Sequence, residues 1–136
     1  MEELIQRAAE AREKSYCPYS HFAVGAALEA EDGTVFSGCN IENASFSPTC
    51  CAERTAFFKA VSSGTTTFRR IVIMGGKKGE KAQRTVPCGV CLQVMLEFCE
   101  PDEFEVILAR SEEEYERYHL KDFLPQGFRL TEGDVQ

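Results

Sequence analysis

Two short cysteine motifs constrain this chain more than any other feature of its sequence. The first is Cys51-Ala52-Glu53-Arg54, and the second is Pro87-Cys88-Gly89-Val90-Cys91. Their thiols could together hold one zinc ion. A tetrahedral zinc with three protein ligands keeps one position open, and that opening distinguishes a catalytic site from a structural one. Glu53 follows the first thiol by two residues, where its carboxylate could shuttle protons.

Other interpretations of these residues exist. A lone C-x-x-C is also typical of a redox pair, but that interpretation leaves Cys51 and Glu53 unexplained. A structural zinc module without activity would need a fourth ligand, which Cys39 or Cys50 would have to supply. Cys50 and Cys51 are adjacent. Neighbouring side chains diverge by about 100° on a helix, so the two can hardly bind one ion.

The length and charge of the chain narrow the class of protein. A chain of 136 residues suits one domain, here residues 1–136. Lys and Arg number 15 against 22 for Asp and Glu, a net charge of −7. This acidic balance argues against a nucleic-acid partner and favours a small neutral substrate. We see no apolar run of membrane-spanning length and no signal segment, so we expect no membrane partner and a cytoplasmic location.

The hydrophobic pattern predicts alternating helices and strands. We expect a helix over 2–14, a hairpin of strands over 23–30 and 34–39, a helix from 48 or 49 to about 62, a strand over 70–74, a helix from 88 to about 100, a strand over 104–109, and a turn or short helix at 112–114. Such an order indicates an α/β protein with a mixed sheet covered by helices.

Five segments, in order, resemble the small homotetrameric cytidine deaminases, and they cover most of the chain. They are Tyr19–Leu28, Gly38–Ser45, Cys51–Arg54, Pro87–Cys91 and Leu124–Phe128. The resemblance implies a three-layer α/β/α fold with a mixed five-stranded sheet. It also implies a zinc enzyme of pyrimidine salvage that deaminates cytidine and 2′-deoxycytidine.

The resemblance also implies roles at the metal. Cys51, Cys88 and Cys91 would bind Zn²⁺, one ion per chain, which leaves Cys50 as a spare thiol. Glu53 would move protons to N3 and to the departing amine, although a glutamate in the first turn of a helix can also simply stabilise that helix. Three thiolates would leave the ion with a net charge of about −1, so Arg54 would offset that charge through hydrogen bonds to the sulfurs.

Further residues would bind the nucleoside. Asn40 and Glu42 would hold the sugar at its 3′-hydroxyl, since a carboxylate and an amide suit a hydroxyl group. The backbone N–H of Ala52 would reach the 2-oxo group of the base. Phe22 would pack against the nucleoside, and Phe128 would stack on the base from a neighbouring subunit of a homotetramer. For each aromatic residue, ordinary packing is the alternative.

Two residues depart from the family pattern. Leu92 stands directly after C-x-x-C, where the family usually has arginine, and Phe46 stands where it usually has tyrosine. Phe46 would still contact the nucleoside through its ring, but it lacks the hydroxyl that could reach the 5′ end of the sugar. These departures leave open an alternative function, the deamination of a modified nucleoside or a nucleoside antibiotic. An enzyme that edits polynucleotides is disfavoured by the charge.

Overall fold

One mixed sheet organises the molecule. The computed structural model describes residues 1–130, and its strands lie in the order β2-β1-β3-β4-β5. The strands are β1 (Phe22–Ala30), β2 (Val35–Cys39), β3 (Phe68–Lys77), β4 (Glu105–Ala109) and β5 (Tyr115–His119). The β3–β4 pair is parallel and the other pairs are antiparallel.

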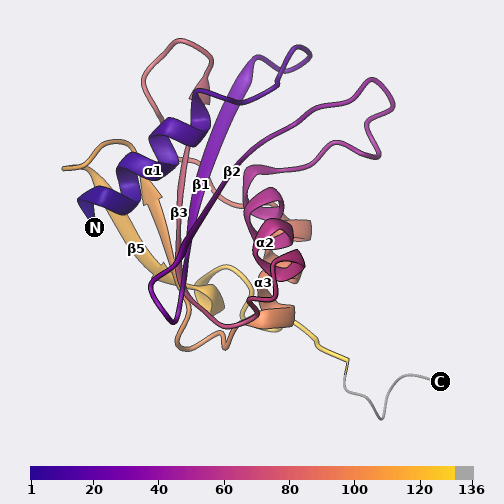
Figure 1. The fold of residues 1–136 in the computed structure, drawn as a ribbon, viewed down its shortest axis with the longest axis vertical. Coiled ribbons are helices and arrows are strands. Elements are labelled where there is room, and N and C mark those ends of the chain that lie inside the picture. Colours follow the sequence, from indigo (N-terminus) through magenta and orange to yellow (C-terminus); the bar gives the residue numbers. More distant parts are fainter. Residues whose placement is uncertain (131–136) are drawn as a thin grey trace.

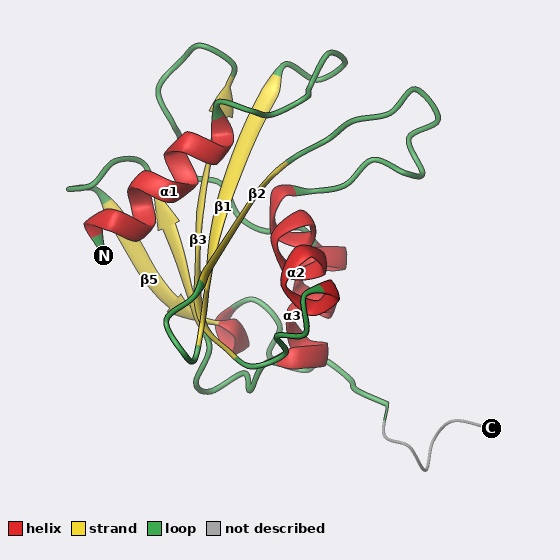
Figure 2. Ribbon diagram, in the orientation of Figure 1, coloured by secondary structure: helices red, strands yellow, loops and turns green. Residues whose placement is uncertain are grey.

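Helices cover both faces of this sheet. They are α1 (Glu2–Arg12), α2 (Ala52–Ser62) and α3 (Gly89–Phe98), with a short 3₁₀ helix η1 (Leu120–Asp122). Helix α1 lies on one face, and α2 and α3 lie side by side on the other (Figures 1 and 2). This arrangement confirms the three-layer α/β/α fold with a mixed five-stranded sheet. Within the described residues, no helix is long and apolar enough to cross a membrane.

The central strands explain how the layers hold together. Side chains alternate between the two faces of a strand. Ile71 and Ile73 of β3 therefore pack under α2 and α3, whereas Val72 packs under α1. A strand buried on both faces reads as a continuous apolar run, which is how residues 71–74 appear in the sequence.

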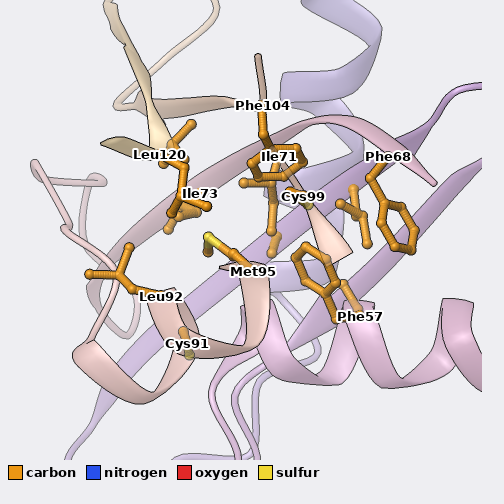
Figure 3. Close-up of a cluster of buried hydrophobic side chains, with 14 of the residues drawn as sticks. Phe57, Phe68, Ile71, Ile73, Cys91, Leu92, Met95, Cys99, Phe104 and Leu120 are labelled. Atoms are coloured by element: carbon orange, nitrogen blue, oxygen red, sulfur yellow. The ribbon is translucent and has the colours of Figure 1, made fainter. Parts of the chain in front are cut away.

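An aromatic cluster fixes α2 and α3 on the sheet. Phe57 of α2 is fully buried, and its ring lies 5.0 Å from that of Phe68 and 6.1 Å from that of Phe104. Met95 of α3 and Cys99 are buried in the same cluster (Figure 3). Cys99 thus behaves as a small apolar side chain. Because the cluster locks both helices to one face, it also sets where their first turns meet.

Three predicted elements need correction. Helix α2 begins at Ala52 rather than at residue 48 or 49, because Cys50 pairs with Ile41 through two backbone hydrogen bonds of 2.9 Å and stays extended. Strand β3 runs over 68–77 rather than 70–74, because Gly75 and Gly76 pair with β1. Helix α1 ends at Arg12, two residues earlier than expected.

Strand β5 was not predicted from the hydrophobic pattern; only the resemblance implied a fifth strand. Its sequence, Tyr115-Glu116-Arg117-Tyr118-His119, is mostly polar. It lies at the edge of the described sheet, where β4 is its one partner strand, so it needs little apolar surface. Pairing with a neighbouring strand, rather than burial of its own side chains, defines this element.

Candidate active site

Three thiols meet where α2 and α3 begin. Cys51 is the N-cap of α2 and Cys88 is the N-cap of α3, while Cys91 lies in the first turn of α3 and donates its backbone N–H to the Cys88 sulfur over 3.5 Å. The three Sγ atoms lie within 4.8 Å of one another. The structure therefore brings together the two motifs that the sequence separates.

The thiol cluster fits a zinc ion. Zn–S bonds of about 2.3 Å at tetrahedral angles place two sulfurs about 3.8 Å apart, and the Cys51 and Cys88 sulfurs lie 3.7 Å apart. Among residues 1–130, no fourth metal-binding side chain joins the group. The Cys39 sulfur instead donates to the Lys14 carbonyl over 3.5 Å, and Cys50 stays outside the group. A closed structural site would need one of these two.

Charge favours thiolate at this position. The start of a helix stabilises negative charge. Hydrogen bonds from Cys91, then from Arg54 and Cys88, lower the pKa of Cys51 to about 5, even though burial opposes this shift. The same interaction with Cys51, and next burial, raise the pKa of Cys91. A coordinated cation would deprotonate all three thiols.

Arg54 is the arginine that contacts this cluster. Its Nη2 atom donates to the Cys51 sulfur over 3.3 Å, as expected for a residue that draws charge from the thiolates. Leu92, at the position where the family usually has arginine, is instead buried in the hydrophobic cluster under α3 (Figure 3). The departure at Leu92 therefore leaves Arg54 as the cation at the sulfurs within the described chain.

Glu53 lies beside the thiols on the first turn of α2. Its side chain is buried, with 4% of the residue exposed, and it lines a pocket together with Cys51 and Cys88. Burial, and next the nearby Cys51 thiolate, raise the pKa of Glu53 to about 7. A carboxyl group with that pKa can both accept and release a proton near neutral pH, which a general acid–base group must do.

The pocket has a volume of about 230 Å³ and contains both predicted and unpredicted residues. The predicted ones besides the thiols and Glu53 are Asn40, Glu42 and Ala52. The unpredicted ones are Cys50, Val24, Thr49, Thr85 and Val86. The last two stand directly before Pro87-Cys88. Their closeness to the ligand Cys88 in the sequence places them near the metal site, but spacing alone does not show that they line the pocket.

The Asn40 side chain makes most of its hydrogen bonds within the protein. Its Oδ1 accepts hydrogen bonds from the backbone N–H of Val24 over 2.9 Å and from the Ser15 hydroxyl, and its Nδ2 donates to the Phe22 carbonyl over 2.8 Å. An amide nitrogen has two donors, so one remains for a ligand. Asn40 thus joins β1 to the segment after β2 and can offer a sugar only one donor.

Glu42 is held in place by the loop before β1. Its carboxylate accepts from the backbone N–H groups of Tyr19 at 2.9 Å and Ser20 at 3.1 Å, and from the Ser20 hydroxyl. Desolvation alone would raise the pKa of Glu42, but these hydrogen bonds outweigh it and lower that pKa. The carboxylate is therefore ionised and oriented before any ligand arrives.

The three predicted aromatic contacts do not line this pocket. Phe22 is half-buried at the start of β1. Phe46 is 72% exposed, and its ring lies edge-on to Tyr19 at 6.5 Å. Phe128 is 67% exposed, and its carbonyl accepts from the Gln93 side chain over 3.0 Å. One chain thus brings the thiols, Glu53 and the polar sugar-binding candidates together, and leaves the aromatic candidates outside.

Known proteins are similar to this chain in sequence and in fold. The chain is 46% identical to a cytidine deaminase of Sporosarcina psychrophila over 128 residues, which cover 94% of this chain and 90% of the relative. It is 45% identical to a cytidine deaminase of Halalkalibacterium halodurans over 92% of this chain and 91% of the relative. The crystal structure of cytidine deaminase from Burkholderia pseudomallei superposes with a TM-score of 0.82 at 44% identity, covering 93% of this chain and 97% of that one.

A family model agrees with these relatives. The model described as "Cytidine and deoxycytidylate deaminase zinc-binding region" matches residues 1–106, a stretch that holds all three clustered thiols and Glu53. With three sulfurs spaced for zinc, a buried carboxyl group beside them and relatives that align over nearly the whole chain, this protein belongs to the cytidine and deoxycytidylate deaminase family of zinc-binding proteins.

Proposed function

We propose that this protein is a zinc-dependent deaminase that converts cytidine and 2′-deoxycytidine to uridine and 2′-deoxyuridine, with release of ammonia. The observation that carries the proposal is the position of Glu53, buried beside a three-thiol cluster and lining the same pocket as Cys51 and Cys88. The names of the relatives support the choice of cytidine. The reaction would return pyrimidine nucleosides to the uridine pool, a salvage role.

Each residue of the cluster has a part in this reaction. Cys51, Cys88 and Cys91 would hold the zinc, and bound zinc supplies the Lewis acidity that makes water nucleophilic near neutral pH. Glu53 takes a proton from the water that attacks C4 and gives it to N3. It then takes the remaining proton of that oxygen and gives it to the amine, which leaves as ammonia while the C4 carbonyl forms. Arg54 donates to the Cys51 sulfur and so reduces the charge that three thiolates would place on the metal.

The pocket favours a nucleoside over a nucleotide. Among residues 1–130, its lining contains the carboxylates of Glu42 and Glu53 and no Lys, Arg or His side chain. A phosphate group would meet negative charge there, whereas a sugar hydroxyl could donate to Glu42. This distinction matters because the family as described includes deaminases of both cytidine and deoxycytidylate.

An absorbance assay of the zinc-loaded enzyme tests the function. Cytidine and 2′-deoxycytidine should both be deaminated, and cytosine and cytidine monophosphate should be turned over far more slowly. Failure to deaminate either nucleoside, in protein with one zinc per chain, would refute the proposal. Faster turnover of a base- or sugar-modified cytidine in the same panel would favour the modified-nucleoside alternative that Phe46 leaves open.

We further propose a homotetramer whose chains share their active sites. The exposed ring of Phe128 supports this proposal, because it lies outside the pocket of its own chain. In the proposed assembly it stacks on the base bound by a neighbour, a contact worth roughly 1–3 kcal/mol in nucleic-acid systems. Phe128→Ala should therefore weaken nucleoside binding about tenfold or more and leave zinc bound.

Complementation tests whether sites are shared. A Glu53→Gln chain keeps Phe128, and a Phe128→Ala chain keeps Glu53. Mixed oligomers of the two variants, formed by co-refolding and verified by mass, should exceed the summed activities of the parents. If they never do, Phe128 does not act between chains.

We also propose that residues 1–136 act as one catalytic unit in the cytoplasm. One sheet carries both helical layers. All seven cysteines are unpaired, which suits a reducing compartment.

A further inference from the structure

The segment between β3 and α3 forms one wall of the pocket. It carries Thr85 and Val86 and ends at Cys88, all of which line the pocket. Its first half is fixed to the fold, because the Gln83 N–H donates to the Gly75 carbonyl over 2.7 Å. After Gln83, residues 84–87 make no backbone hydrogen bond to any other element in the described part of the chain. Some other contact must therefore hold this stretch.

Arg84 provides that contact. Its Nε atom lies 3.2 Å from each carboxylate oxygen of Glu116, and its Nη2 donates to the Tyr118 hydroxyl over 3.2 Å. The guanidinium carbon also lies 5.9 Å from the centre of the Tyr118 ring. Tyr118 in turn donates to Glu116 and packs edge-on against Phe123 at 5.1 Å. One arginine thus ties the pocket wall to edge strand β5 through two linked side chains.

Thr85 itself packs closely against Gly75 of β3. A Cβ atom on Gly75 would lie 2.7 Å from the Thr85 hydroxyl, so the missing side chain of Gly75 allows this close approach. Arg84 holds the chain on one side of Thr85, and Gly75 receives the Thr85 side chain on the other. Besides the tether, this packing, the bond at Gln83 and the burial of Pro87 keep residues 84–87 against the fold.

We propose that Arg84 is a positioning residue for the active site: its contacts with Glu116 and Tyr118 hold the wall that carries Thr85, Val86 and the zinc ligand Cys88. This inference rests on the proposed function for its kinetic readout. Arg84 does not line the pocket, so it acts through the segment and not on the substrate. Strand β5, the edge strand of the described sheet, thereby gains a role in the site.

The expected effect is moderate. The Arg84 and Glu116 side chains are 43% and 39% exposed, so solvent screens the pair. Surface ion pairs of this kind change an equilibrium by about twofold to fivefold, and the additional hydrogen bond from Nη2 to the Tyr118 hydroxyl places this one toward the upper end. We therefore expect Arg84→Ala to raise KM for cytidine about threefold to fivefold and to change kcat by less than about twofold.

A matched control separates positioning from general surface charge. Arg117 lies on β5 beside Glu116, but it binds Glu105 at 3.4 Å and lies over Tyr115 rather than over the pocket wall. Arg117→Ala should leave KM unchanged, whereas Arg84→Ala should raise it. Arg84→Lys should give an intermediate KM, because lysine keeps the positive charge but lacks the separate N–H groups of the guanidinium. Equal KM values for wild type and Arg84→Ala, or equal increases in both alanine variants, would overturn the proposal.

Two further measurements keep the test independent of catalysis and of folding. Zinc transfer to a chelator should be faster in Arg84→Ala than in wild type or Arg117→Ala, and an unchanged rate would contradict the tether at Cys88. Should Arg84→Ala fold poorly, Glu116→Gln tests the same pair from β5, with the same expected rise in KM. A wild type that deaminates no cytidine would refute the function, while the chelator rates would still decide the tether.

Discussion

Replacement of Glu53 by glutamine separates catalysis from folding and metal binding. Glutamine has nearly the size and shape of glutamate, so Glu53→Gln creates no cavity at this buried position. The three sulfurs come from other residues, and the variant should bind one zinc per chain. It lacks only the ability to accept and release a proton. Any loss of activity therefore reports on proton transfer.

The kinetic loss should be large. A positioned general acid–base group contributes about 10²–10⁴-fold to a rate, and Glu53 would serve more than one transfer in a single turnover. We expect kcat for cytidine to fall by at least three orders of magnitude, toward or beyond the upper end of that range, with little change in nucleoside affinity. Binding of the unreacted nucleoside, measured by calorimetry, would confirm that the pocket is intact.

The same substitution should stabilise the metal-free protein at high pH. Folding raises the pKa of Glu53 from an ordinary 4.5 to about 7, so the folded state favours the protonated form. The stability that this carboxyl group contributes is present below pH 4.5 and is lost as the pH rises to about 7. At about 1.4 kcal/mol per tenfold change, the loss is about 3 kcal/mol at most. Glutamine has no charge to bury and avoids it.

Two measurements test this reasoning together. Urea unfolding of chelator-treated protein at pH 5 and pH 8 should show that Glu53→Gln loses less stability than wild type over that interval. Zinc-loaded protein gives the kinetic comparison. Near-normal turnover in the variant would refute the proton-transfer role. Parallel stability profiles for the two proteins would mean that Glu53 is not desolvated in the folded state.

Four further predictions follow from named contacts. Cys50→Ala should keep zinc and activity while Cys51→Ala loses both, and metal analysis that reverses this order would reassign the ligand. Arg54→Ala should keep zinc, lower kcat about tenfold or more and move the pH–rate profile to higher pH, because a hydrogen bond to a charged sulfur is lost. An unshifted profile would exclude a role for Arg54 in reducing the charge at the metal. Burial raises the pKa of Cys99 to about 12, so at pH 8 iodoacetamide should label it only after unfolding, as mass spectrometry can show. Phe57→Ala should cost about 3–5 kcal/mol in chemical denaturation, and a loss below about 1 kcal/mol would mean that the aromatic cluster does not anchor α2.

Local spacing explains why part of the site could be predicted. Cys88 and Cys91 lie one helical turn apart, and Glu53 follows Cys51 on the first turn of another helix. Residues so close in sequence have a fixed relation once the helix forms. The start of α2 was placed too early, because the Ile41–Cys50 pairing that keeps the chain extended up to Cys50 joins residues that are not neighbours in the sequence.

The pocket wall could not be predicted in the same way. Thr85 and Val86 reach the pocket because a tether to β5 and a glycine on β3 hold their segment there. Strand β5 itself has no clear hydrophobic pattern, so the sequence does not indicate that Arg84 contacts a strand there. Asn40 shows a related limit. Its amide was expected to serve a sugar, but most of its hydrogen bonds join β1 to the segment after β2.

The positions of the predicted residues, some inside the pocket and some outside it, favour active sites that are shared between chains. Everything that needs fixed geometry for chemistry lies within one chain: the thiols, Glu53, and a Glu42 carboxylate oriented by Tyr19 and Ser20. The rings expected to contact the nucleoside lie outside that pocket, and Phe46 and Phe128 are the most exposed large apolar residues in the described chain. Covering such rings would remove apolar surface from water, which is favourable. A second chain that closes the pocket would provide a ring to stack on the base of the nucleoside. The same contact would bury that exposed ring. This is why the mixed oligomers of Glu53→Gln and Phe128→Ala chains are the sharpest test of the proposed assembly.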